Sequence, residues 1–283
     1  MIAIRRNYYW LLVLLLLGGC VESPWIRNIQ VFNEKGSMML GSELISIPAP
    51  DSRLPDYEKL TYEVRWLGLL VGTFSTSVTG VQNYKGRDVY MLEAEMKTNA
   101  FLSKIYKIED RFVSYMDTEK LYTLRQEVYR REGKYKKDAI IEFDQTNHKA
   151  YFKNSIDNSE KSFDIPEGIH DVLSACYYLT LLPLKVGGRV EYPVYNNEHN
   201  YQFFGLIKSK VLIKLPTLGN NKNEAYLVQP YANLKGKKVD KGSVSAYFSS
   251  QERRILLLAK LKGPVFTEVT ISLSKIENGA RPD

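Results

Sequence analysis

Cysteine and histidine are scarce in this chain, which has two cysteines and three histidines among its 283 residues. The histidines His148, His170 and His199 stand without metal-ligand spacing, and the motifs H-E-x-x-H and C-x-x-C are missing. We therefore expect neither a metal site nor a cofactor. A fold stapled by several disulfides is excluded as well, because two cysteines form at most one such bond.

Sequence signatures of covalent and phosphate chemistry are also missing. The chain has no G-x-S-x-G turn and no glycine-rich loop between a strand and a helix. His170, Asp171 and Ser174 could suggest a nucleophile triad, but adjacent helical side chains point about 100° apart and do not orient one another. Asp171 is instead expected to cap a helix, with Gly168 as the alternative.

Paired carboxylates are the remaining candidates for chemistry. Glu93 and Glu95 share one face of a predicted strand, and Glu109 lies at the start of another. Two acids hydrolyse a glycosidic bond only at a suitable separation and with one pKa raised. The apolar residues that alternate with Glu93 and Glu95 favour a solvent-facing position for both acids. We therefore expect no catalysis, with a cell-wall polysaccharide enzyme as the least favoured alternative.

The longest apolar run lies at the N-terminus, from Trp10 to Leu17, and two arginines precede it. The sequence Leu17-Gly18-Gly19-Cys20 follows, which is typical of a bacterial secretory signal that ends in a lipobox. The run is too short to span a bilayer, which needs about 20 apolar residues. A signal peptide that is cleaved elsewhere remains the alternative.

Lipid on Cys20 would anchor the mature chain to the cell envelope, because two or more acyl chains hold a protein on a membrane stably. Val21 follows the cysteine in place of aspartate, which in enteric bacteria favours transfer to the outer membrane, with the protein facing the periplasm. Nucleic acid is not an expected partner, since the net charge of +7 is mild and no nucleic-acid motif is present.

Positive residues gather in two segments, 130–137 and 235–241, and both contain glycine. This composition favours solvated hairpin tips. Contact with anionic lipid headgroups is the alternative.

The chain divides into four predicted parts. Residues 1–19 are the lipoprotein signal peptide, and residues 20–56 are a lipidated tether that prolines interrupt near its end. Residues 57–277 form an antiparallel β domain, and residues 278–283 are a C-terminal tail.

The β domain shows apolar residues at every second position, as in Leu60, Tyr62, Val64 and Trp66. Turn residues separate about a dozen such strands. One helix is expected between Ile169 and Leu182, and a shorter one over residues 100–106. The predicted fold is therefore mainly β: a large antiparallel β-barrel or strongly curved sheet, with one amphipathic helix as lid or plug. A flattened sandwich is the alternative.

Residues 171–179, Asp-Val-Leu-Ser-Ala-Cys-Tyr-Tyr-Leu, resemble the helix pattern D-x-L-S-A-x-Y-x-L of a bacterial envelope family called domain of unknown function 3108 (DUF3108). The opening segment 60–73 and the closing segments 230–236 and 247–255 resemble the same family. Together they cover residues 57–273. The resemblance implies an exported, largely antiparallel β domain that is often a lipoprotein, and it implies no reaction.

Aromatic residues are abundant, with 20 Tyr, 11 Phe and 3 Trp. A closed barrel of about a dozen strands is wider than its own side chains fill, so a ligand would occupy the remainder. We predict a lipid, glycolipid or other amphiphile in a cavity. The expected cavity wall is Tyr62, Val64, Trp66 and Phe74, and the expected lid residues are Leu173, Cys176 and Tyr177, with Cys176 buried. A structural lipoprotein that binds an envelope protein partner is the main alternative.

Overall fold

The computed structural model describes residues 43–48, 52–219, 221–239, 242–263 and 268–279. The predicted signal peptide and Cys20 lie outside these residues, as do most of the predicted tether and the end of the predicted tail. Within the predicted tether, Leu44 pairs with Arg189 and Ile45 is buried.

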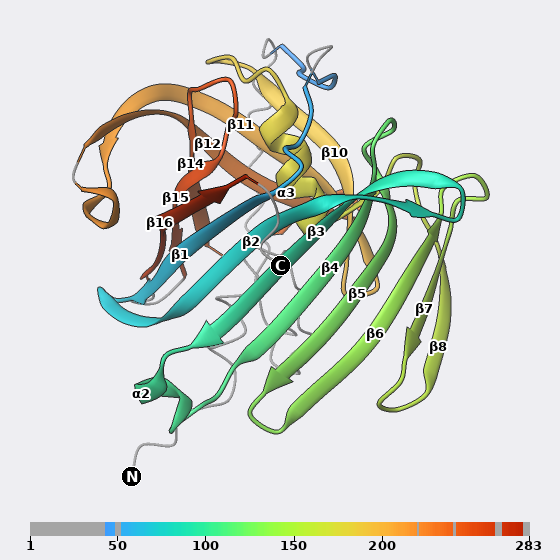
Figure 1. The fold of residues 1–283 in the computed structure, drawn as a ribbon. Helices are drawn as coiled ribbons and strands as arrows, with labels where there is room; N and C mark the ends of the chain where they lie inside the picture. The colour runs from blue at the N-terminus through green and yellow to red at the C-terminus, as the bar shows by residue number, and fades with distance from the viewer. Residues whose placement is uncertain (1–42, 49–51, 220, 240–241, 264–267, 280–283) are drawn as a thin grey trace.

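One sheet of sixteen strands dominates the described part of the chain (Figure 1). In its first half, consecutive strands form hairpins because short turn sequences separate alternating segments. Their bounds are β1 Glu58–Trp66, β2 Leu69–Tyr84, β3 Arg87–Thr98, β4 Glu109–Asp117, β5 Thr123–Glu132, β6 Tyr135–Asp144, β7 Lys149–Asn154 and β8 Ser159–Asp164. In β1, Leu60, Tyr62 and Val64 are buried and the residues between them less so, which confirms the predicted alternation.

The second half of the sheet is also antiparallel, except where β9 and β10 pair in parallel. Its strands are β9 His170–Asp171, β10 Arg189–Asn196, β11 His199–Lys214, β12 Lys222–Leu234, β13 Lys237–Lys238, β14 Ser243–Ser249, β15 Leu256–Lys262 and β16 Glu268–Asn278. A 3-10 turn, η2 Pro216–Leu218, follows β11. Strand β16 pairs with β1 and so joins the two halves.

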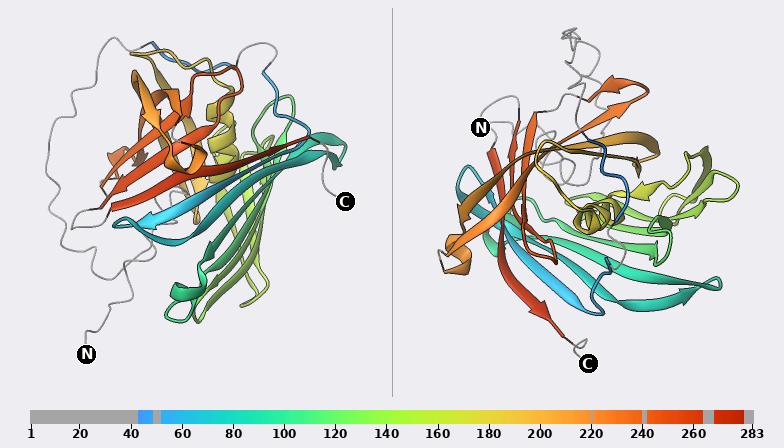
Figure 2. Two further views of the ribbon diagram at one scale, coloured as in Figure 1. Left: turned by 60° about the vertical axis from the view of Figure 1, so that its left-hand side comes forward. Right: turned by 90° about the horizontal axis from the view of Figure 1, so that it is seen from above.

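The strands run in the order β8-β7-β6-β5-β4-β3-β2-β1-β16-β15-β14-β12-β11-β10-β9, with β13 beside β12. The sheet curls strongly around a central helix (Figure 2). Its two edge strands do not pair with each other, so the sheet is not closed into a barrel. The strongly curved sheet is therefore the confirmed form of the predicted fold, with more strands than the dozen expected.

Strand β8 approaches the β10–β11 hairpin through side chains, along a line that we call the seam, and Phe163 of β8 packs against Tyr195 of β10 with 6.2 Å between the ring centres. There Lys161 Nζ lies 2.5 Å from Glu198 Oε2. Asn200 Nδ2 donates to the backbone oxygen of Asp164 at 2.6 Å. Both contacts are exposed, and each joins β8, or its last residue, to the β10–β11 hairpin.

The central helix is α3, Val172–Leu181, which lies within the predicted helical segment. Leu173, Tyr177 and Leu181 lie in the larger apolar core, which also contains residues from β1 to β7. Val172, Ala175 and Leu179 belong to a second core with residues of β10 to β14. The helix is buried on nearly all sides, as an apolar helix inside a protein should be, and it acts as a plug between two walls.

The second helix, α2 Ala100–Ser103, is short and exposed. No helix in the described residues is long and apolar enough to cross a membrane.

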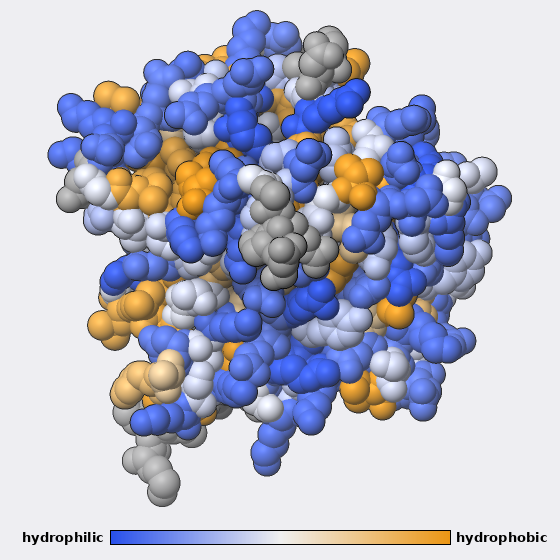
Figure 3. All heavy atoms as spheres, viewed as in Figure 1, coloured by the Kyte–Doolittle hydropathy of each residue, from blue (hydrophilic) through white to orange (hydrophobic). Residues whose placement is uncertain are grey.

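An exposed apolar patch lies where α2 meets the β1–β2 turn, and its space-filling surface is visible at the lower left of Figure 3. Its residues are Leu67, Leu69, Leu70, Phe101 and Ile105. Asn99 connects the two elements, since its Nδ2 donates to the backbone oxygen of Leu70 at 2.6 Å. Patches of this kind often mark interaction sites. The alternative role of binding an envelope protein would use such a surface, and it stays a prediction.

Candidate functional site

A hollow lies on the concave face of the sheet, where β4 to β7 meet the first turn of α3 and the end of β10. Its volume is about 560 Å³, which includes space open to solvent. The apolar wall consists of Phe112, Val128, Ile141, Phe152, Leu173 and Tyr195, and Val172 adjoins it. The polar lining consists of Gln126, Arg130, Lys137, Asn196 and Asn197. We call this feature the concave hollow.

Strand geometry brings these residues to one face. Side chains alternate along a strand, so Gln126, Val128 and Arg130 of β5 point to the same side. Across the sheet, Val128 pairs with Ala139 and Arg130 pairs with Lys137. The side chain of Ala139 is small, so the pair Val128–Ala139 leaves space above the sheet. The pair Arg130–Lys137 places two cations side by side at one end of the concave hollow. The concave hollow thus combines an apolar wall with a cationic end formed by Arg130 and Lys137.

Two buried acids hold Arg130. Its Nη2 lies 2.5 Å from Glu132 Oε1, and its Nε lies 3.5 Å from Asp110 Oδ2. Burial raises the pKa of Glu132 to about 7; Arg130 opposes this shift, and the nearby carboxylate of Asp110 adds to it. One guanidinium thus faces two carboxylates, and near neutral pH Glu132 readily takes a proton.

Lys137 has a different environment. Its Nζ lies 4.8 Å from the centre of the Phe152 ring, and burial lowers the pKa of its ammonium group. Among the ion pairs formed by described residues, none involves Lys137, although each of its strand neighbours Arg130, Arg131 and Asp138 has a charged partner. Lys137 is therefore a half-buried cation without a carboxylate in contact.

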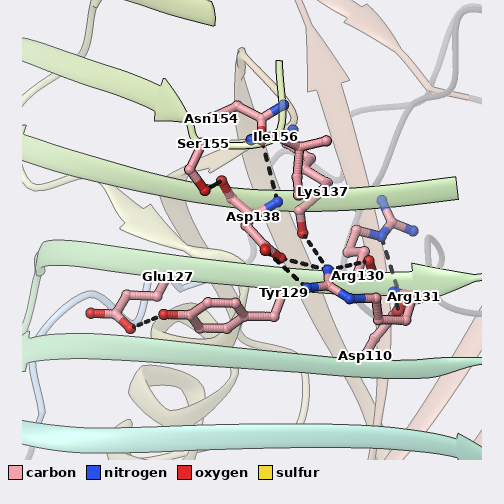
Figure 4. A network of polar contacts seen from close by, with 10 residues as sticks. All are labelled: Asp110, Glu127, Tyr129, Arg130, Arg131, Lys137, Asp138, Asn154, Ser155 and Ile156. Carbon is pink, nitrogen blue, oxygen red and sulfur yellow. Dashed lines mark hydrogen bonds and ion pairs between the residues drawn. The ribbon is translucent and has the colours of Figure 1, made fainter. Parts of the chain in front are cut away.

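On the convex face of the same strands, charged side chains have polar partners (Figure 4). Arg131 Nη1 and Nη2 donate to the two carboxylate oxygens of Asp138 at 2.5 and 2.8 Å. Tyr129 donates to Glu127 at 2.8 Å. The outer surface consequently offers no comparable half-buried cation among these residues.

The first turn of α3, which closes the apolar end of the concave hollow, is fixed by Asp171. Its carboxylate accepts from the backbone N–H groups of Leu173 and Ser174 at 2.8 and 3.3 Å, which confirms the predicted cap. It also accepts from the hydroxyls of Ser114 and Thr123. Burial raises the pKa of Asp171, and these hydrogen bonds oppose the shift. The helix is thereby tied directly to β4 and β5.

The arrangement around His170 does not form a nucleophile triad. His170 is buried against the rings of Tyr178 and Tyr192, at 4.6 and 5.3 Å between ring centres. Burial lowers the pKa of His170 to about 3, so the ring is neutral. Ser174 Oγ donates to the backbone oxygen of Asp171 at 3.1 Å, which is a local helix contact.

The predicted wall residues lie elsewhere in the interior. Tyr62, Val64 and Phe74 are buried in the larger core, and the rings of Tyr62 and Phe74 lie 5.8 Å apart. Trp66 is half-buried against the same core. None of these four lines the concave hollow. Their side of the interior is filled by packed side chains.

The three predicted lid residues lie in three different environments. Leu173 lines the concave hollow, whereas Tyr177 is buried in the larger core. Cys176 is exposed, so the expectation that it is buried was wrong. It lies on the side of α3 that neither core covers, yet enough protein surrounds it that desolvation raises the pKa of its thiol to about 12. The thiol therefore stays protonated at neutral pH.

The other candidate groups remain apart. Glu93 pairs with Arg111 and Glu95 with Lys97, each at 3.1 Å, on the outer face of the sheet as predicted. Glu109 pairs with Lys107 at 2.8 Å. In the described residues, no group of three or more His, Cys, Asp or Glu side chains could hold a metal ion.

Sequence reasoning misses the cationic end of the concave hollow, because the composition of segment 130–137 favours a solvated hairpin tip. Gly133 and Lys134 do form an exposed turn, but Arg130 is buried and Lys137 half-buried. The sequence does contain a signal, which is the alternation of side chains along a strand. Arg130 is two positions after the inward-facing Val128, and Lys137 is two positions before the inward-facing Ala139, so both cations point inward. A charged residue in an inward strand position marks a buried polar site.

We predict that Glu132 makes the wild-type protein lose stability as the pH rises from 4.5 to about 7, and that Glu132→Gln abolishes this contribution. Between the ordinary value of 4.5 and about 7, folded Glu132 keeps a proton that the unfolded chain loses. The folded state therefore loses stability as pH rises through this window. At pH 7.5 the variant should be about 1–3 kcal/mol more stable than the wild type, with a much smaller difference at pH 4.5.

Urea unfolding at the two pH values measures this difference. His170 acts in the opposite direction, because its lowered pKa makes stability rise with pH between about 3 and 6.5. Comparing the variant with the wild type at each pH cancels that contribution. A difference that is the same at both pH values would contradict the prediction.

Comparisons with known proteins are consistent with this architecture. A family model described as "Protein of unknown function (DUF3108)" matches residues 61–272. No curated protein matches the chain.

A solved structure from Brucella abortus, a β-barrel-like protein of the domain of unknown function DUF1849, has a TM-score of 0.50 at 5% identity. The match covers 79% of this chain and 98% of that chain, and it supports the fold alone. A provisionally assigned lipoprotein from Parabacteroides distasonis matches with 8% identity over 80% of this chain and 96% of that one, at a TM-score of 0.31. That score is too low to establish a shared fold.

Proposed function

This chain belongs to the DUF3108 family, and since the family description names no activity, we propose a function from the concave hollow. The protein is a lipid-anchored binding protein of the bacterial envelope that holds a hydrophobic or amphiphilic ligand and does not alter it chemically. The anchor at Cys20 and an outer-membrane location facing the periplasm are parts of the proposal, supported by the lipobox pattern.

One observation carries the proposal: an open hollow with an apolar wall and a few polar groups, two of them cations at one end. Ligand sites have this composition in general, because apolar contacts supply affinity and a small number of polar groups fix orientation. The position supports the same conclusion, since the concave hollow lies beside the seam, where no backbone pairing closes the sheet. A ligand could enter there without breaking strand pairs.

We predict that Val128→Trp weakens binding of the neutral fluorescent probe N-phenyl-1-naphthylamine by at least about tenfold. Val128 lies in the middle of the apolar wall, so a larger ring at this position occupies space that the probe needs. Fluorescence titration of the purified mature protein measures the affinity.

Val81→Trp is the matched control, because Val81 is exposed on β2 and does not line the concave hollow. It should bind the probe like the wild type. Thermal unfolding of both variants shows whether they fold, since a larger core residue costs about 1–3 kcal/mol. A folded Val128→Trp protein with unchanged affinity would disprove the concave hollow as the ligand site.

A further inference from the structure

We infer that the ligand of the concave hollow is an anionic amphiphile, with its acyl chain along the apolar wall and its carboxylate or phosphate at Lys137. This inference rests on the proposed function and names the class of ligand. It follows from how charge and apolar surface are arranged along β5 and β6.

The first step concerns position. Lys137 is half-buried and lines the concave hollow, across the strand pair from Arg130. Its Nζ lies 4.8 Å from the centre of the Phe152 ring, which is part of the apolar wall. If an amphiphile lies along the apolar wall, this ammonium group is placed to contact its headgroup, next to the start of its acyl chain.

The second step concerns charge. Arg130, the other cation of the concave hollow, is held by Glu132 and Asp110, so its charge is balanced within the protein. No ion pair of the described residues balances Lys137. A half-buried cation without an anionic partner costs free energy that an anionic ligand would recover.

The acids nearest to Lys137 have other partners. Glu198 contributes to the electrostatic environment of Lys137, but it pairs with Lys161 at 2.5 Å. Asp157 also contributes, and it accepts two hydrogen bonds from Ser159, one from the backbone N–H and one from the hydroxyl. Neither carboxylate takes the position of a ligand anion at Lys137.

The third step concerns length. Gln126 and Arg130 are four positions apart on β5, which corresponds to about 14 Å along the strand. Val128 lies between them, and Leu173 of α3 closes the apolar end. A chain that lies along this stretch of β5 would have its headgroup at the cationic end, with the polar atoms of Asn196 and Asn197 also lining the hollow.

The test is displacement of N-phenyl-1-naphthylamine from the mature protein at pH 7.5 by dodecanoate, by dodecyl phosphate and by 1-dodecanol, each below its micelle concentration. We expect both anionic compounds to bind about tenfold more tightly than the alcohol. In Lys137→Met, which keeps an unbranched side chain over Phe152, this preference should fall to within about threefold. Lys137→Arg should keep it.

Lys136→Met is the matched control, because Lys136 is exposed on the other face of the same strand and the charge change is identical. It should keep the full preference. Thermal unfolding confirms that each variant folds. Inorganic phosphate alone should not displace the probe; displacement by it would assign the site to a free anion and overturn the inference.

The outcomes separate this inference from the proposed function. If all three compounds displace the probe equally, the concave hollow binds ligands but the anionic class is wrong. The same conclusion follows if Lys137→Met keeps the preference or Lys136→Met loses it. If the probe itself does not bind the wild type, the proposed function fails, and the inference fails with it.

Discussion

Arg253→Met should lower the free energy of unfolding by about 3 kcal/mol, because it leaves a buried carboxylate without its partner. Arg253 lies in the loop between β14 and β15, and its Nη2 lies 2.5 Å from Oε1 of Glu58. Glu58 is only 2% exposed, so water cannot replace the lost guanidinium. In a domain of this size the change corresponds to a fall of about 6–12 °C in melting temperature.

The same arginine joins three distant parts of the chain. Its Nη1 donates to Thr180 Oγ1 of α3 at 3.0 Å and to the backbone oxygen of Arg254 at 2.6 Å. Through Glu58 it also reaches the start of β1. Its loss therefore affects the end of the plug helix and the strand that joins the two halves of the sheet.

Differential scanning calorimetry of the single and double variants checks this prediction. Adding Glu58→Gln to Arg253→Met should recover more than half of the lost stability, because the unpaired charge is removed. Arg254→Met is the control; no ion pair of the described residues includes Arg254, and its loss should cost less than about 1 kcal/mol. Equal losses for Arg253→Met and Arg254→Met would show that the Glu58 pair contributes nothing.

Asp171→Ala should also cost about 3 kcal/mol, because four donors lose their acceptor in a fully buried place. Two of them are the cap hydrogen bonds of α3, and the other two tie the helix to β4 and β5. Asp171→Asn should cost less, since its amide oxygen can still cap the helix and burial no longer opposes a charge.

Urea unfolding at pH 7 measures both variants against Asp157→Ala. Asp157 is an exposed acid that accepts local bonds from Ser159, so its loss removes similar turn bonds without burial. We expect that control to unfold at nearly the same urea concentration as the wild type. A shift in Asp171→Ala no larger than that of the control would mean that the buried network does not hold the helix.

The strands could be predicted from the sequence because the alternation of apolar and polar residues is a property of each segment alone. Leu60, Tyr62 and Val64 show their inward face without knowledge of any neighbour. Strand β8, Ser159–Asp164, escaped prediction because its sequence SEKSFD is polar and it lies at an edge of the sheet, where burial does not impose a pattern. Local signals are strongest where a strand has an apolar side to bury.

The location of the hollow could not be predicted, because it depends on strand order and register. Tyr62 and Val128 have similar apolar surroundings in sequence, but only Val128 pairs with a residue as small as Ala139. The pairing of β1 with β16 connects residues more than two hundred positions apart, such as Glu58 and Asn278. No periodicity in either segment carries that information.

A closed β-barrel can open only if the hydrogen bonds between two neighbouring strands break. Here β8 and the β10–β11 hairpin are joined at the seam through Lys161 with Glu198 and Asn200 with Asp164, contacts on the surface that are worth about 1 kcal/mol or less each. These surface contacts can therefore open at small energetic cost, while every strand keeps its hydrogen-bonded neighbours and the buried contacts of Asp171 hold α3 against β4 and β5. On the proposed function, a margin that opens in this way would admit ligand chains of different thickness without a change of fold.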